Sequence, residues 1–147
     1  MTLRAELQQA ASADGVPDEQ TFQSWLDRCF DDADDQTVLI RIVEEDESRQ
    51  LNRDYRGKDY PTNILSFPFE VPEGIPNSHL GDLVICADVV ARQAREQGKP
   101  LAHHWAHMLV HGVLHLQGYD HTDPEEASEM EAIETRLLAR LGIPDPY

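Results

Sequence analysis

The sequence has few cysteines and no long apolar run. Its only cysteines, Cys29 and Cys86, lack the spacing of a metal-binding or redox motif. We therefore expect two buried thiols in a reducing compartment and no disulfide. No apolar run approaches the roughly 20 residues of a membrane-spanning helix. The charged N-terminal stretch is unlike a signal peptide. Together these absences predict a cytoplasmic protein.

Basic residues are scarce as well. The chain has 12 Lys and Arg against 28 Asp and Glu, a net charge of −16 at pH 7. This balance argues against a general nucleic-acid binder, because phosphate contacts require basic side chains. The deficit is uneven, and we interpret the acidic ends of the chain as solvated faces. An anionic substrate is expected near residues 38–60, where six acids are nearly balanced by five bases: Arg41, Arg49, Arg53, Arg56 and Lys58.

Length and patterning predict one α+β domain over residues 1–147, with a small mixed β-sheet packed with helices. Alternation and β-branched residues indicate strands, and Pro68 suggests that the third strand is at an edge of the sheet or ends there. Apolar residues at helical spacing indicate the helices, the last of which starts with Asp123 as N-cap and Pro124 in its first turn. The expected strands are 3–7, 37–43, 63–67 and 80–86, and the other helices run from residue 18 to the acidic run 31–35, then 46–55, 87–97 and 101–117.

Three histidines in the stretch HGVLHLQGYDH carry the clearest chemical signal. His111 and His115 are one helical turn apart, so both rings can reach one ion. Gly118 can end the helix in a left-handed turn and return His121 toward them. Three imidazoles with no evident fourth protein ligand are typical of a catalytic zinc site, whose open position holds a reactive water. We predict one Zn²⁺ on a central helix and the following turn, although nickel, copper or iron would also accept these ligands.

The simpler alternative is a group of unrelated histidines in a histidine-rich helix. A specified triple spacing arises by chance in roughly 2% of chains with this many histidines, which favours the metal site. His107, one turn before His111, is expected to support the site or the fold without binding the ion. His79, His103 and His104 are interpreted as surface or satisfied polar residues.

The same spacing occurs in metzincin zinc proteases, whose pattern begins H-E-x-x-H. Here position 112 is glycine. The glutamate that serves as general base in those proteases is therefore missing, which argues against a peptidase and leaves the metal site intact.

Three blocks of the sequence resemble the YbeY endoribonuclease family. The first is HGVLHLQGYDH, and the others are NRDYRGKDYPTNILSFP at residues 52–68 and LGDLVI at residues 80–85. The similarity weakens only over about the first thirty residues. It implies a metal-dependent endoribonuclease specific for single-stranded RNA, which matures the 3′ end of small-subunit ribosomal RNA and takes part in ribosome quality control. The implied partners are ribosomal RNA and the small ribosomal subunit, with no DNA and no membrane.

The resemblance also implies zinc at His111, His115 and His121 and a functional arginine at Arg56. A guanidinium there can bind non-bridging phosphate oxygens through two parallel hydrogen bonds. The alternative is a surface residue paired with Asp54 or Asp59.

Several polar residues have weaker claims on the site. Arg53 and Lys58 are candidates for steering RNA. Asp120 and Asp82 could each orient an imidazole, with a structural role equally open. Ser66 and Thr62 are expected to cap turns near the cleft.

Two other functions stay open from the sequence. One is a different zinc hydrolase such as a peptidase, and the other is a non-enzymatic ribosome-assembly factor with a structural zinc. Structural zinc sites usually have four protein ligands, so the number of ligands separates this last possibility from catalysis.

Overall fold

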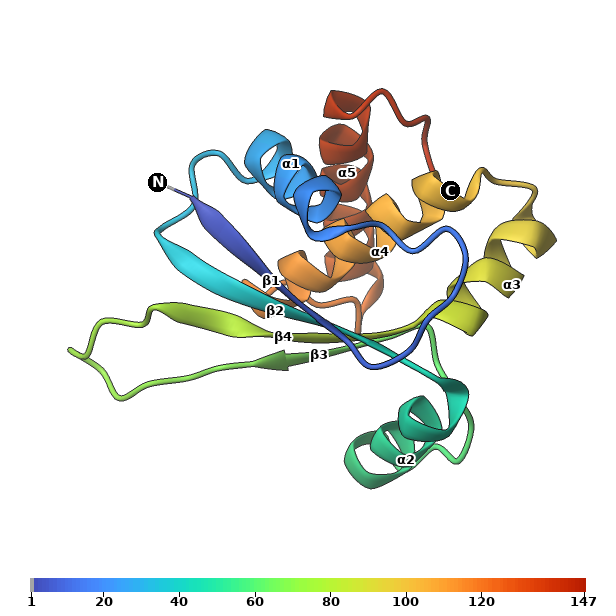
Figure 1. The fold of residues 1–147 in the computed structure, drawn as a ribbon. Helices are drawn as coiled ribbons and strands as arrows, with labels where there is room; N and C mark the ends of the chain where they lie inside the picture. The colour runs from blue at the N-terminus through green and yellow to red at the C-terminus, as the bar shows by residue number, and fades with distance from the viewer. Residues whose placement is uncertain (1) are drawn as a thin grey trace.

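The computed structural model describes residues 2–147, which form a four-stranded sheet and five helices (Figure 1). The elements follow the order that the sequence predicts. They are β1 (Leu3–Gln9), α1 (Glu19–Cys29), β2 (Gln36–Val43), α2 (Glu45–Arg56), β3 (Ile64–Pro68), β4 (His79–Cys86), α3 (Ala87–Gln97), α4 (Leu101–Leu116) and α5 (Pro124–Arg140).

The ends of the elements differ from the predicted ones by one or two residues, with one instructive case. Strand β1 continues to Gln9, past the end of its apolar alternation at Leu7. Its last residues stay extended because they pair in parallel with β2, up to Gln9 opposite Ile42. Pairing with a neighbouring strand therefore extends β1 where its own side chains give no signal.

The sheet is mixed, with strand order β1-β2-β4-β3. β1, β2 and β4 are parallel, whereas β3 runs antiparallel to β4 and forms one edge of the sheet. Pro68 is the last residue of β3, which agrees with its predicted edge position and end. The α+β class with a small mixed sheet is confirmed.

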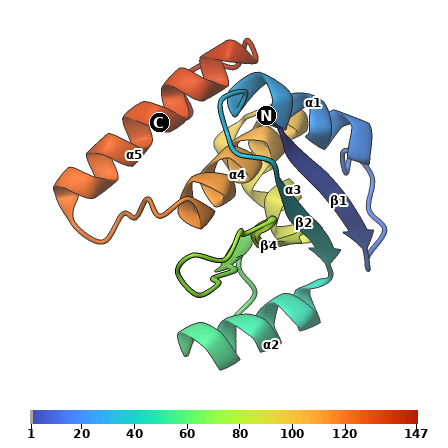
Figure 2. The same cartoon turned by 90° about the vertical axis from the view of Figure 1, so that its left-hand side faces the viewer.

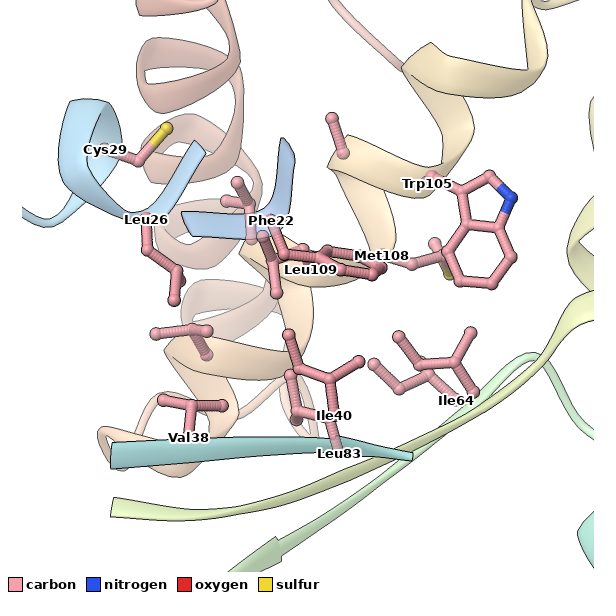
Figure 3. Close-up of a cluster of buried hydrophobic side chains, with 14 of the residues drawn as sticks. Phe22, Leu26, Cys29, Val38, Ile40, Ile64, Leu83, Trp105, Met108 and Leu109 are labelled. Atoms are coloured by element: carbon pink, nitrogen blue, oxygen red, sulfur yellow. The ribbon is translucent and has the colours of Figure 1, made fainter. Parts of the chain in front are cut away.

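The main core lies between one face of the sheet and helices α1, α4 and α5. Figure 3 shows Phe22 and Leu26 of α1 facing Leu109 of α4, above Ile40 and other residues of the sheet. Helix α4 is central, since every residue from His104 to Val110 is buried. The prediction of a central, buried helix over this segment is correct.

Helix α4 approaches the sheet most closely at Gly112. A Cβ atom built on Gly112 would lie 2.7 Å from Cδ1 of Ile64 and 2.8 Å from Cδ2 of Leu83. Position 112 therefore faces the sheet and not solvent. The glutamate of the protease pattern would have no room at this position, because Ile64 and Leu83 fill the space beside Gly112.

The opposite face of the sheet carries a smaller cluster made of Val43, Leu65, Val84, Cys86 and Val89. Helix α2 covers this face, and Figures 1 and 2 show it on the side away from α1, α4 and α5. Leu51 of α2 and Phe67 of β3 pack against the cluster.

Strand β3 contributes to both cores, because side chains alternate along a strand. Ile64 belongs to the main core, whereas Leu65 belongs to the smaller cluster on the other face. The β3 edge thus separates the side of the sheet that holds α4 from the side that holds α2.

Both cysteines are free and buried, as the sequence predicts. Burial raises the pKa of the Cys29 thiol to about 11 and also raises the pKa of Cys86. Over residues 2–147, no helix has the length and apolar character that crossing a bilayer requires.

The close contact at Gly112 predicts that Gly112→Glu is strongly destabilising. The new carboxylate would be buried between Ile64 and Leu83 without a partner, so the free energy of unfolding should fall by about 3 kcal/mol or more. Urea denaturation measures this change. The control is Ala102→Glu, an exposed position near the start of the same helix, with an expected change within about 0.5 kcal/mol. Equal stability of Gly112→Glu and the wild type would contradict the close packing of α4.

Candidate metal centre and cleft

The three predicted histidines lie together at the C-terminal end of α4 and in the turn after it. One ring nitrogen from each of His111, His115 and His121 lies within 4.8 Å of the other two. The ring centroids are 4.7 Å apart for His111 and His115, 4.9 Å for His115 and His121, and 5.6 Å for His111 and His121. The group could therefore hold one metal ion.

The turn after α4 brings His121 back to the helix. Gly118 has a φ of 101°, a left-handed conformation that glycine adopts readily. The N–H of Gly118 donates to the carbonyl of His115, and the N–H of Tyr119 donates to that of Leu114, both at 3.0 Å. This pair of bonds is the Schellman motif, which reverses the chain at a helix end. The local sequence therefore places His121 beside the two helical histidines.

The donor set suits zinc or a similar transition-metal ion. All three donors are imidazole nitrogens, and within residues 2–147 no fourth His, Cys, Asp or Glu joins the group. Burial, followed by the nearby His111 and His121 rings, lowers the pKa of His115. This shift favours the neutral form of His115, which a metal ligand needs.

A buried carboxylate on α5 orients the first of these histidines. Oε1 of Glu134 accepts a hydrogen bond of 2.5 Å from Nδ1 of His111, which leaves Nε2 of the ring free for an ion. Oε2 of the same carboxylate accepts from Nε2 of His107 at 3.1 Å and from the hydroxyl of Tyr147. Glu134 is fully buried, so these bonds replace the hydrogen bonds that its carboxylate would form with water in the unfolded chain.

The charge of Glu134 is stabilised by the same three groups. Burial acts to raise the pKa of this carboxyl, but the hydrogen bonds from His107, His111 and Tyr147 outweigh burial and lower the pKa to about 2. A fixed anion behind a metal-binding imidazole keeps the ring in one tautomer and one orientation.

Sequence reasoning missed Glu134, although the sequence contains a signal for it. The residue lies in the apolar stripe of α5, between the buried Met130 and Leu137. A carboxylate at a core position of an amphipathic helix needs a buried partner. That argument points to Glu134, but the helix alone does not tell which residue is the partner.

The structure places the other candidate histidines outside the metal group. His107 contacts Glu134 and so supports His111 indirectly, as expected. His79 is half-buried and bonds to Thr37 at 2.6 Å. His103 is also half-buried, whereas His104 differs from the expectation of a surface or satisfied residue.

His104 is only 2% exposed, and its Nδ1 has no hydrogen-bond partner within residues 2–147. Its Nε2 bonds to Oε1 of Gln93 at 2.9 Å. Burial, with smaller effects of Lys99 and His107, lowers the pKa of His104 to about 4. The fold thus buries His104 as a neutral histidine, which the sequence did not distinguish from the other histidines of α4.

Neither Asp82 nor Asp120 bonds to the ring of a histidine in the metal group, so neither has the ring-orienting role considered for it. Oδ1 of Asp82 bonds to Nε2 of His79 in the same strand at 2.7 Å, so Asp82 contacts a histidine outside the metal group. Asp120 lies at the cleft, but its Oδ1 accepts from the backbone N–H of His121 at 2.7 Å. Asp120 therefore shapes the turn that carries the third histidine.

The histidines open onto a cleft of about 670 Å³ whose other wall comes from α2 and β3. Arg56, the last residue of α2, is exposed and lines this cleft. Within residues 2–147, Arg56 forms no ion pair, because Asp54 pairs with Arg53 at 3.4 Å and Asp59 with Arg49 at 2.7 Å. The structure thus contradicts the surface-pair alternative for Arg56.

Buried polar residues of α2 hold the segment between Arg56 and β3 in place. The N–H of Thr62 donates to Oγ of Ser48 at 2.9 Å, and Nδ2 of Asn52 donates to the carbonyl of Tyr60 at 2.8 Å. Ser48 and Asn52 are 2% and 1% exposed, so both bonds are shielded from water. They fix the end of α2 beside β3, where Ser66 lines the cleft.

The chain is similar to known proteins over nearly its whole length. The family described as Endoribonuclease YbeY matches residues 6–142. An Endoribonuclease YbeY from Halorhodospira halophila is 58% identical, over 99% of this chain and 96% of that protein. The solution structure of TM1509 from Thermotoga maritima has a TM-score of 0.65 and 27% identity, over 95% of this chain and 88% of that one. The chain belongs to the Endoribonuclease YbeY family.

Proposed function

We propose that this protein is a metal-dependent endoribonuclease that cleaves single-stranded RNA during ribosomal RNA processing. His111, His115 and His121 would hold one Zn²⁺, and Arg56 would bind the scissile phosphate. One observation carries the proposal: the three-histidine group and an arginine that has no ion-pair partner within residues 2–147 line the same cleft. The family supports the choice of RNA as substrate.

Hydrolysis of a phosphodiester adds water across a P–O bond. The water oxygen bonds to phosphorus, and the bond from phosphorus to one ribose oxygen breaks with its electron pair. That ribose oxygen takes the proton that the water loses. A divalent ion on the three histidines supplies a Lewis acid for this reaction.

Arg56 is suited to stabilise the charge that develops on the phosphate. Its guanidinium can donate two parallel hydrogen bonds to the non-bridging oxygens. Asp54 and Asp59 pair with other arginines, so among residues 2–147 neither competes with a phosphate for this guanidinium. Arg53 is less suited to steering RNA since it is paired, whereas Lys58 forms no ion pair within residues 2–147.

The structure gives grounds to weigh the two alternatives. A metzincin-like peptidase lacks support because Gly112 faces the sheet and offers no general base. A structural zinc is disfavoured because the group provides three ligands and opens onto a cleft.

The cellular setting follows from the same proposal. The substrate would be the 3′ region of small-subunit ribosomal RNA, reached on the small ribosomal subunit in the cytoplasm. An acidic protein gains little from general attraction to RNA, so a local cleft or a partner surface must provide the affinity.

The first test is cleavage of a single-stranded ribosomal RNA fragment by the wild type, Arg56→Ala and His115→Ala. Loss of the guanidinium should lower kcat/KM by about 100-fold or more, with zinc still bound. His115→Ala should lose both zinc and activity. Metal content by atomic absorption and cleavage by gel assay measure the two effects.

Arg95→Ala is the matched control, since this exposed arginine on α3 does not line the cleft. It should cleave like the wild type. Equal cleavage by all four proteins would show that a contaminating nuclease is responsible, and the assembly-factor function would then be preferred.

Glu134→Gln tests the orientation of His111 separately from RNA cleavage. Without the carboxylate charge, zinc affinity should fall by about 10- to 100-fold, since partners behind metal ligands typically contribute that much. Competition with a chromophoric chelator measures the affinity. Glu131→Gln, at an exposed position one turn earlier, should bind zinc as the wild type does. Unchanged affinity in a folded Glu134→Gln protein would contradict the orienting role.

A further inference from the structure

An aromatic pair lies next to Arg56 in the wall of the cleft. Tyr55, in the last turn of α2, and Phe67 of β3 both line the cleft. Their ring centroids are 5.1 Å apart and their planes meet at 70°. The two rings come from different elements, and the hydrogen bonds that fix α2 beside β3 also fix this pair.

Packing in the fold does not account for Tyr55. The residue is 68% exposed, the highest value among the large exposed hydrophobic residues of the described chain. Phe67, in contrast, is half-buried and packs against the smaller core. Phe67 is therefore held in place by the smaller core, whereas most of the Tyr55 ring is accessible to a ligand in the cleft.

The charge of the protein makes an aromatic contact the more effective source of RNA affinity. The net charge is −16. Of the five bases in residues 38–60, three are paired with carboxylates: Arg41, Arg49 and Arg53. Within this segment, few basic side chains are therefore left to bind phosphates. Stacking of a base on an aromatic ring contributes independently of charge and of base identity.

We propose that Tyr55 and Phe67 form a stacking subsite for the base of a nucleotide adjacent to the scissile phosphate. The inference rests on the proposed function, because it takes RNA as the substrate and Arg56 as the phosphate ligand. Tyr55 directly precedes Arg56, so a base on the ring and a phosphate on the guanidinium would belong to the same short stretch of strand.

This subsite accounts for selection of single-stranded RNA. In a duplex, each base is stacked between its neighbours and paired, so neither face is available to a protein ring. An unpaired base can leave its stack and lie against Tyr55. Duplex RNA would therefore lose this contact and bind less well in the cleft.

The test compares Tyr55→Ala and Tyr55→Phe with the wild type in steady-state cleavage of a short unstructured RNA. Loss of one stacking contact should lower kcat/KM by about 5- to 150-fold, whereas phenylalanine should retain near wild-type activity. Tyr60→Ala is the matched control, since Tyr60 is 52% exposed but does not line the cleft.

A second measurement uses the wild-type enzyme and does not depend on a variant that folds. Substrates carry a single abasic nucleotide at each position around the cleaved bond. At one position next to that bond, the abasic nucleotide should lower the kcat/KM of the wild type by the same factor as Tyr55→Ala does on the intact substrate. On that abasic substrate, Tyr55→Ala should have the same kcat/KM as the wild type. This lack of additivity identifies the base that contacts Tyr55.

The outcomes separate the subsite from the proposed function. If the wild type cleaves RNA but Tyr55→Ala is as active, or if the abasic and Tyr55→Ala losses add, the stacking subsite is wrong and the nuclease remains. If the wild type does not cleave any single-stranded RNA, the proposed function fails and the subsite fails with it.

Discussion

The close packing of α4 on the sheet at Gly112 is the constraint on which the rest of the structure depends. The helix buries its apolar residues against Ile64 and Leu83 on one side and carries His111 and His115 on another. A larger residue at position 112 would displace the helix and with it both histidines. Their positions are therefore determined by the hydrophobic core, which resists small displacements because it is closely packed.

A second constraint on the site comes from α5, which packs against α4. Its buried Glu134 replaces lost water with hydrogen bonds from His107, His111 and Tyr147. Such a network is costly if one member is missing, because the remaining polar groups are then buried without partners. The network connects the end of the chain to the histidine group, so α5 and the C-terminal residues belong to the site.

The cleft is built across an edge of the sheet. The histidines stand on the side of α4, whereas Arg56 and Tyr55 stand on the side of α2, and β3 runs between them. An edge strand has no further strand beside it, so a long ligand can cross the sheet margin without displacing an element. This arrangement suits an extended single strand better than a compact ligand.

The order of elements, their approximate limits and the clustering of three histidines were predictable from the sequence, because each depends on residues close together in the chain. Apolar periodicity identifies helices and strands, and the four-residue spacing followed by Gly118 brings His111, His115 and His121 together through local hydrogen bonds. The resemblance to a known family supplied Arg56, which no local pattern distinguishes from the other bases of α2.

Only the tertiary structure decided which distant residues meet. Glu134 is 23 residues from His111 in the sequence, and its carboxylate reaches that ring only because α5 packs against α4. The contact of Tyr55 with Phe67 likewise requires α2 to fold back beside β3. These contacts follow from how whole elements pack, and packing depends on shape and burial over the entire domain. The sequence by itself therefore determined the elements and the histidine triad. Packing of whole elements determined that Glu134 bonds to His111 and that α2 and β3 form the opposite wall of the cleft.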